Sequence, residues 1–190
     1  MDWVYNLISP DEVVRHEALA WHQELLREDR EQTIQRPLEA FFHSRDTGNF
    51  LARARYAPFA VLYLRWEVSF PDEWRMRGSY LWSPWTMKEA LLGEFERGGI
   101  PEAVQPQLAE LVLDALQRPY RCKDWKYALQ VRHVADAEFI SEVEALLDAA
   151  DPLTSLRARF ILHVADNASL HITRKTWLRW LEAHGQAKAP

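Results

Sequence analysis

The sequence predicts a mainly α-helical fold, arranged as a multi-helix bundle or a short helical stack, and three observations carry this prediction. Apolar residues recur at helical spacing over several segments, which gives each segment one apolar face. A residue able to cap a helix precedes a proline at 9–10, 83–84 and 151–152, and this pair is typical of a helix N-terminus. The chain of 190 residues has only 6 glycines, which argues against a loop-rich all-β fold.

The N-terminal part of the chain is predicted to hold two helices. The first begins with Ser9 as its N-cap and runs to about Gln32, and its many charges indicate an outer helix with one docked face. The second follows Pro37 and ends at 46–49. Its two adjacent phenylalanines at 41–42 are expected in the core.

The segment 60–82 supports two interpretations. Apolar residues alternate with other residues over 60–70 and again over 74–82, and a Pro-Asp breaker separates the two runs. This period-two pattern predicts an inserted β-hairpin. The same segment also fits a helix followed by an irregular loop, because one helical face collects Phe59, Leu62, Trp66 and Phe70. Periodicity alone does not decide between the two, so both remain open.

The next three predicted helices cover 84–98, 106–118 and 124–134. The first two begin at or beside a proline; the first ends at a glycine pair and the second just before another proline. Each helix carries an apolar face, formed by Met87, Leu91 and Phe95, by Leu108, Leu111, Val112, Ala115 and Leu116, and by Tyr127, Val131 and Val134.

Two antiparallel helices are predicted over 136–166, and they meet at the corner formed by Asp151 and Pro152. The first helix has one apolar stripe. The second has two neighbouring stripes, so it needs packing partners on two sides. After a brief loop, Thr173 is predicted to cap a last helix that ends at Gly185.

The run LLDAADPLTSLRARFILHVAD resembles the second half of a HEAT-type repeat. It has the Asp-Pro corner, followed in the expected order by Leu156, Arg157, Ala158 and Leu162. Stacked repeats need at least ~3 copies for stability, and the sequence contains no clear second copy. The resemblance therefore implies a short helical stack around 136–166 and not a long solenoid.

Length and composition predict one helical domain over 1–184 and a disordered tail over 185–190. The formal net charge of −5 disfavours a nucleic-acid partner, which needs a concentrated basic face. The only cysteine, Cys122, allows no disulfide within the chain. No segment has the pattern of a signal peptide or a membrane span. We therefore expect a cytoplasmic protein without a membrane partner.

Tryptophan, tyrosine and arginine concentrate at 63–85 and again at 118–123. These residue types dominate protein-binding hot spots because they bury a large area and keep a polar end. The competing interpretation is that the rings are ordinary core residues with arginines at their edges. The predicted binding residues are Trp66, Trp74, Arg75, Arg77, Trp82, Trp85, Tyr120 and Arg121.

Catalytic and metal-binding candidates are few. Cys122 has basic neighbours at a predicted helix start, which is a setting that activates thiols. However, His133 lies about three turns along that helix and does not supply a base by local spacing. The pairs Glu12 and His16, Glu39 and His43, and His163 and Asp166 share helix faces but lack the Glu-x-x-His spacing of di-metal bundles. We predict no cofactor and no metal site.

Two function hypotheses from different classes follow. The first is a non-catalytic protein that binds another protein, as an adaptor or as an inhibitor or immunity-type neutraliser. Small size, acidic balance and the lack of a catalytic motif favour it. The alternative is an enzyme with a helical active site that uses Cys122 or a cluster of histidines and carboxylates. The sequence favours the first hypothesis.

Overall fold

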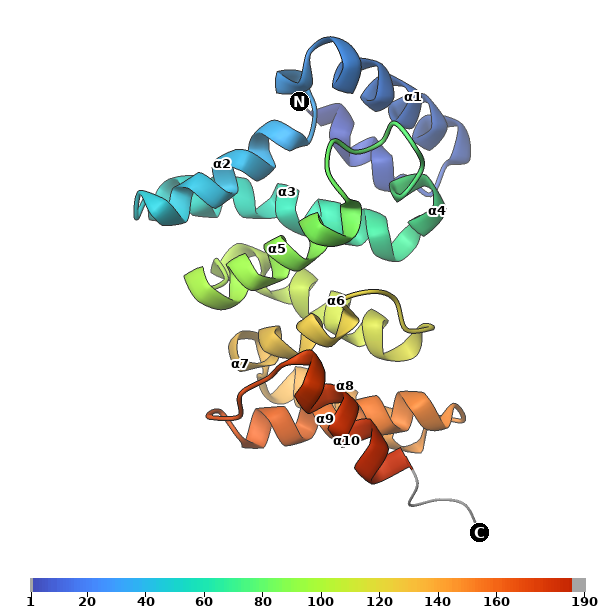
Figure 1. Cartoon of the computed structure of the whole chain (residues 1–190), viewed down its shortest axis with the longest axis vertical. Coiled ribbons are helices and arrows are strands. Elements are labelled where there is room, and N and C mark those ends of the chain that lie inside the picture. Colours follow the sequence, from blue (N-terminus) through green and yellow to red (C-terminus); the bar gives the residue numbers. More distant parts are fainter. Residues whose placement is uncertain (1, 186–190) are drawn as a thin grey trace. The chain divides into compact units, whose positions relative to one another are not determined.

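The computed structural model describes residues 2–185, and none of these residues forms a β-strand (Figure 1). The predicted mainly α-helical fold is confirmed. The chain divides into two compact units, one formed by Met1–Glu94 with Ile100–Val104 and the other by Phe95–Gly99 with Gln105–Pro190. The single-domain interpretation stays a prediction. The predicted disordered tail lies outside the described residues, apart from Gly185, which ends the last helix.

The first unit is built from long helices joined by short 3-10 turns. In chain order it contains η1 (Asp2–Ile8), α1 (Glu12–Glu28), η2 (Arg30–Gln32), α2 (Gln35–Asp46), α3 (Phe50–Ser69), α4 (Pro71–Trp74), most of α5 (Pro84–Gly98) and η3 (Glu102–Val104). The second unit contains the end of α5 and then α6 (Gln105–Gln117), η4 (Asp124–Gln130), α7 (Val131–Val134), α8 (Ala137–Ala145), η5 (Leu146–Asp148), α9 (Pro152–Asp166) and α10 (Arg174–Gly185).

Helix α3 is the centre of the first unit, and it decides the open question about residues 60–82. This helix packs against η1, α2, α4 and η3. Its residues 60–64 are all buried, although consecutive residues of a helix point in different directions. A helix that is apolar all round is a buried one. The β-hairpin interpretation is therefore wrong, and the alternative of a helix followed by an irregular loop is confirmed.

The start of the first long helix differs from its prediction. Asp11 is the N-cap of α1, because its carboxylate accepts hydrogen bonds from the backbone N–H groups of Val13 and Val14. Ser9 instead accepts a hydrogen bond from the Asp11 N–H. Ser9 and Asp11 both offer a capping oxygen, and the helix begins at the Asp11 carboxylate. The helix also ends at Glu28, earlier than predicted.

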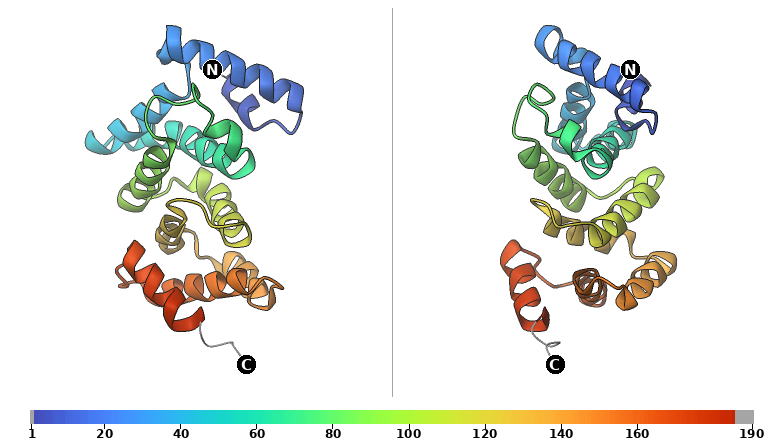
Figure 2. Two further views of the ribbon diagram at one scale, coloured as in Figure 1. Left: turned by 45° about the vertical axis from the view of Figure 1, so that its right-hand side comes forward. Right: turned by 90° about the vertical axis from the view of Figure 1, so that its right-hand side faces the viewer.

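The second unit follows its predicted pattern more closely. Asp151 caps α9 through the N–H groups of Leu153 and Thr154, as expected. Thr173 accepts a hydrogen bond from the Thr176 N–H at the start of α10. The right-hand view of Figure 2 shows α9 between α8 and α10, which explains its two apolar stripes.

The predicted helix over 124–134 is only partly confirmed. Tyr127, Val131 and Val134 are buried as expected. The backbone is nevertheless a 3-10 helix up to Gln130, and only the short α7 follows it. Lys123 precedes this element with a φ of 68°, which marks a sharp change of chain direction.

Candidate functional site

Two of the predicted binding residues, Trp66 and Trp74, are fully buried in the core of the first unit. Tyr63 contacts both rings edge-on, with centroid distances of 6.4 Å to Trp66 and 5.7 Å to Trp74. Trp85 is half-buried, and its ring lies 5.0 Å from that of Trp74. Large rings at such angles and distances are favourable core contacts. These tryptophans therefore build the core and do not form a free surface.

The loop between α4 and α5 carries the exposed part of the predicted set. We call residues 75–83 the 75–83 loop. Trp82 is 51% exposed, Met76 is 45% exposed and Leu81 is 39% exposed. Arg75 and Arg77 of the same loop are also exposed. The sequence predicted Trp82 and the two arginines as binding residues but not Met76 or Leu81.

The base of the 75–83 loop is attached to α1 by an ion pair. The Arg15 Nε lies 2.9 Å from one carboxylate oxygen of Glu73 and 3.0 Å from the other. Arg15 also donates to the Ser9 carbonyl and stacks over the ring of Phe70 at 3.8 Å. Both partners of the ion pair are mostly buried. The Arg15 guanidinium has three contacts, with Glu73, Ser9 and Phe70. It therefore restricts the position of the Glu73 side chain, which directly precedes Trp74.

The middle of the loop is attached to α1 at Ser79, which is itself buried. The His22 Nε2 lies 3.1 Å from the Ser79 carbonyl oxygen, and the Gln23 side-chain amide donates to the Ser79 hydroxyl at 3.0 Å. A backbone hydrogen bond from the Ser79 N–H to the Met76 carbonyl closes a tight turn, in which Gly78 has a φ of 93°. Such a turn needs glycine at this position. Contacts from α1 and this turn therefore hold the backbone of the loop at Ser79.

His22 is held in its neutral form. A carbonyl oxygen only accepts hydrogen bonds, so Nε2 must carry the proton in the contact with Ser79. The other ring nitrogen, Nδ1, is buried without a hydrogen-bond partner. Burial lowers the pKa of His22 to about 4, and the hydrogen bond to Ser79 opposes this shift. Protonation would place a charge without a partner in the core.

This geometry predicts a pH dependence of the free energy of unfolding. The pKa of His22 is about 4 in the folded chain and about 6.5 in the unfolded chain. The unfolded state therefore binds more protons between these values, so the contribution of His22 is complete above pH ~6.5 and is lost as the pH falls towards ~4. We expect a loss of up to about 3 kcal/mol over this window.

Urea unfolding of the wild type and of His22→Gln at a series of pH values checks this prediction. The glutamine can still donate towards Ser79 but does not titrate. The free energy of unfolding is compared between the two proteins at each pH. Because the carboxylates titrate in both proteins, the difference reports the contribution of His22. Parallel curves from pH 7 to pH 4.5 would contradict the proposed protonation state.

The second predicted patch, around Tyr120 and Arg121, lies in the second unit. Tyr120 is 44% exposed, and its ring stacks on Trp177 at 6.2 Å with an interplanar angle of 12°. Arg121 is half-buried, and its backbone N–H donates to Asp124 at 2.6 Å. Arg118 forms an ion pair with the same carboxylate at 2.8 Å. Of the two predicted residues Tyr120 and Arg121, only Tyr120 is therefore exposed.

Among the described residues, Cys122 and His133 form no hydrogen bond with each other. Cys122 is exposed. His133, the base considered for it, lies half-buried with its Nε2 3.3 Å from the Glu96 carbonyl oxygen. His16 contacts the carboxylates of Glu12 at 3.9 Å and Glu73 at 3.3 Å. Over residues 2–185, no three His, Cys, Asp or Glu side chains converge as metal ligands do.

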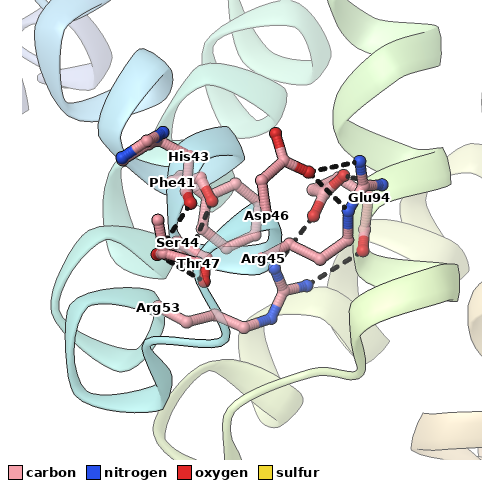
Figure 3. A network of polar contacts seen from close by, with 8 residues as sticks. All are labelled: Phe41, His43, Ser44, Arg45, Asp46, Thr47, Arg53 and Glu94. Atoms are coloured by element: carbon pink, nitrogen blue, oxygen red, sulfur yellow. Dashed lines mark hydrogen bonds and ion pairs between the residues drawn. The ribbon is translucent and has the colours of Figure 1, made fainter.

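Two buried ion clusters in the first unit hold helices together. Glu94 is almost fully buried and accepts from Arg45 at 2.7 Å and from Arg53 at 3.1 Å (Figure 3). Arg53 also donates to the Glu94 carbonyl at 2.9 Å. In the second cluster the Lys88 Nζ lies 3.1 Å from the Glu67 carboxylate, and neither side chain is exposed. These ion pairs tie α5 to α2 and α3, and Arg45 is their exposed member, with 38% of its side chain accessible.

No helix among the described residues combines the length and apolarity needed to cross a membrane. Comparison of the chain with protein-family models, curated proteins and solved structures found no match.

Proposed function

We propose that this protein is a non-catalytic protein that binds another protein, either as an adaptor or as an inhibitor or immunity-type neutraliser. The observation that carries the proposal is the 75–83 loop, where Met76, Leu81 and Trp82 are exposed while contacts from α1 hold the backbone beneath them. A preordered loop loses little conformational entropy on binding. Tryptophan in particular is enriched among residues that dominate binding energy.

The chemistry of the loop indicates the kind of partner surface that fits it. Trp82 and Leu81 suit an apolar cleft. Arg77 is exposed and makes no ion pair within residues 2–185, so a carboxylate at the rim of the cleft would complement it. Arg75 is already paired with Asp72 at 2.6 Å. The partner is therefore expected to present an apolar cleft with an acidic rim.

Two features of the sequence agree with this proposal. The resemblance of α8 and α9 to a HEAT-type repeat fits a binding role, because stacked helical repeats commonly form protein-binding surfaces. A single cysteine, Cys122, fits a reducing compartment, so the proposal includes a cytoplasmic location.

The proposal predicts that Trp82 contributes a large part of the binding energy. The partner is captured by cross-linking in lysate of the producing cells, identified by mass spectrometry and purified. Calorimetric titration then compares the wild type with Trp82→Ala. We expect the variant to bind at least about 30-fold more weakly, since truncation of a central hot-spot residue costs about 2 kcal/mol.

Phe50→Ala is the matched control. Phe50 is an exposed aromatic residue of the same unit, and it stands at the opposite end of α3, a helix about 30 Å long. We expect this variant to bind within about twofold of the wild type. Equal affinities for the wild type and Trp82→Ala would refute the loop as the binding surface.

A further inference from the structure

Helix α10 carries a hollow surface whose side chains are mostly cationic. Arg174, Lys175, Leu178, Arg179 and Glu182 line it, and all five are exposed. The four residues Arg174, Lys175, Leu178 and Arg179 are called the α10 cationic face below. Residues four apart on a helix are neighbours, so Lys175 and Arg179 share one edge while Arg174 and Leu178 share the other.

The three cations of this face have no acidic partner among the residues that the structure describes. Arg174, Lys175 and Arg179 form no ion pair within residues 2–185. By contrast, Arg15, Arg75 and Arg118 are each paired with a carboxylate. Three adjacent cations repel one another, and an external anionic group would relieve that repulsion.

The side of α10 opposite the α10 cationic face packs against α9, so the cationic face points towards solvent. Trp177 is buried against Phe160 of α9 at 4.8 Å, and Trp180 lies 5.6 Å from the same ring. Figure 2 shows that α10 lies along one side of α9. Tyr120 stacks on Trp177 on that packed side of α10.

We propose that the α10 cationic face binds a short acidic segment of another protein. Carboxylates of the segment pair with Arg174, Lys175 and Arg179, and one apolar side chain lies against Leu178. This surface shares no residue with the 75–83 loop, and the proposal does not depend on the function proposed for that loop.

An acidic peptide segment fits this surface better than a nucleic acid. The three cations span five residue steps, or about 8 Å along the helix, whereas a nucleic acid gains its affinity from a longer row of phosphate contacts. Leu178 lies among the cations and favours a partner with an apolar side chain. Glu182 closes one end of the hollow and, with the net charge of −5, opposes a long polyanion.

The test uses the full chain and a fluorescein-labelled peptide of glutamates around one central leucine, followed by anisotropy at low ionic strength. We expect saturable binding that weakens steeply with added salt. Arg174→Glu combined with Lys175→Glu should weaken binding at least tenfold, because each change replaces attraction by repulsion. Both changes place glutamate in the first turn of α10, where it suits the helix dipole, so the fold is expected to persist.

Arg159→Glu is the matched control, since Arg159 is an exposed cation of α9 outside the hollow and also lacks an ion pair within the described residues. It should bind within about twofold of the wild type. A peptide with serine in place of leucine should bind several-fold more weakly to the wild type but not to Leu178→Ser. The proposal is overturned if the double variant binds like Arg159→Glu, if oligothymidylate of equal charge binds more tightly, or if millimolar inorganic phosphate displaces the peptide completely.

Discussion

Lys88→Met is expected to lower the free energy of unfolding by about 3–5 kcal/mol. Lys88 and Glu67 form an ion pair at 3.1 Å in which neither side chain is exposed. Methionine fills a similar volume but leaves the Glu67 carboxylate buried without its cation. The desolvation of that carboxylate is then no longer offset by attraction to the ammonium group, and this is the main source of the loss.

A second substitution separates the effect of the lost ion pair on stability from the effect of the changed packing. Glu67→Leu in the Lys88→Met background removes the carboxylate that has lost the Lys88 cation, so we expect at least half of the lost stability to return. Urea unfolding followed by tryptophan fluorescence measures the double variant and the single variants Lys88→Met and Glu67→Leu. If the double variant is as unstable as the sum of the two single variants, the ion pair does not couple the two residues and our account of the core is wrong.

Trp74→Ala should also cost about 3–5 kcal/mol of stability, whereas Trp82→Ala should change stability by less than about 0.5 kcal/mol. The contrast follows from burial. Trp74 is fully enclosed between Tyr63 and Trp85, so its removal leaves a cavity that the packed rings cannot fill. Trp82 is 51% exposed and leaves no cavity.

Thermal or urea unfolding of the two alanine variants, side by side, checks this contrast between neighbouring tryptophans. Trp82→Ala is therefore the variant with which binding can be tested on a folded protein. A large loss of stability in Trp82→Ala would show that the 75–83 loop is part of the core, and the binding proposal would lose its basis.

Local patterns predicted most of the helices correctly. The caps at Asp151 and Thr173 and the buried stripe of α6 follow from residues within one or two helical turns. Such features depend on short-range hydrogen bonds and on helical spacing, both of which are visible in a sequence. The cap of α1 was misplaced because Ser9 and Asp11 both offer a capping oxygen within two residues, and the sequence pattern does not decide between them.

The candidate site could be predicted only in part. Arg75, Arg77 and Trp82 were predicted from composition, and they lie on the exposed loop. The anchors of that loop were missed, because His22 and Gln23 are 57 and 56 positions away from Ser79 in the sequence. The cations of the α10 cationic face were visible as a cluster in a predicted helix, but their lack of acidic partners was not.

The sequence by itself determined that the chain is helical and which side of most helices is apolar, because both depend on neighbours within a few residues. Only the tertiary structure decided which rings are core and which are surface. Trp66, Trp74 and Trp82 have the same side chain and lie within one short stretch, yet two are fully buried and one is half exposed. The physical reason is that burial depends on the elements packed around α3 and on the contacts from α1 to Ser79, and these join residues far apart in the chain.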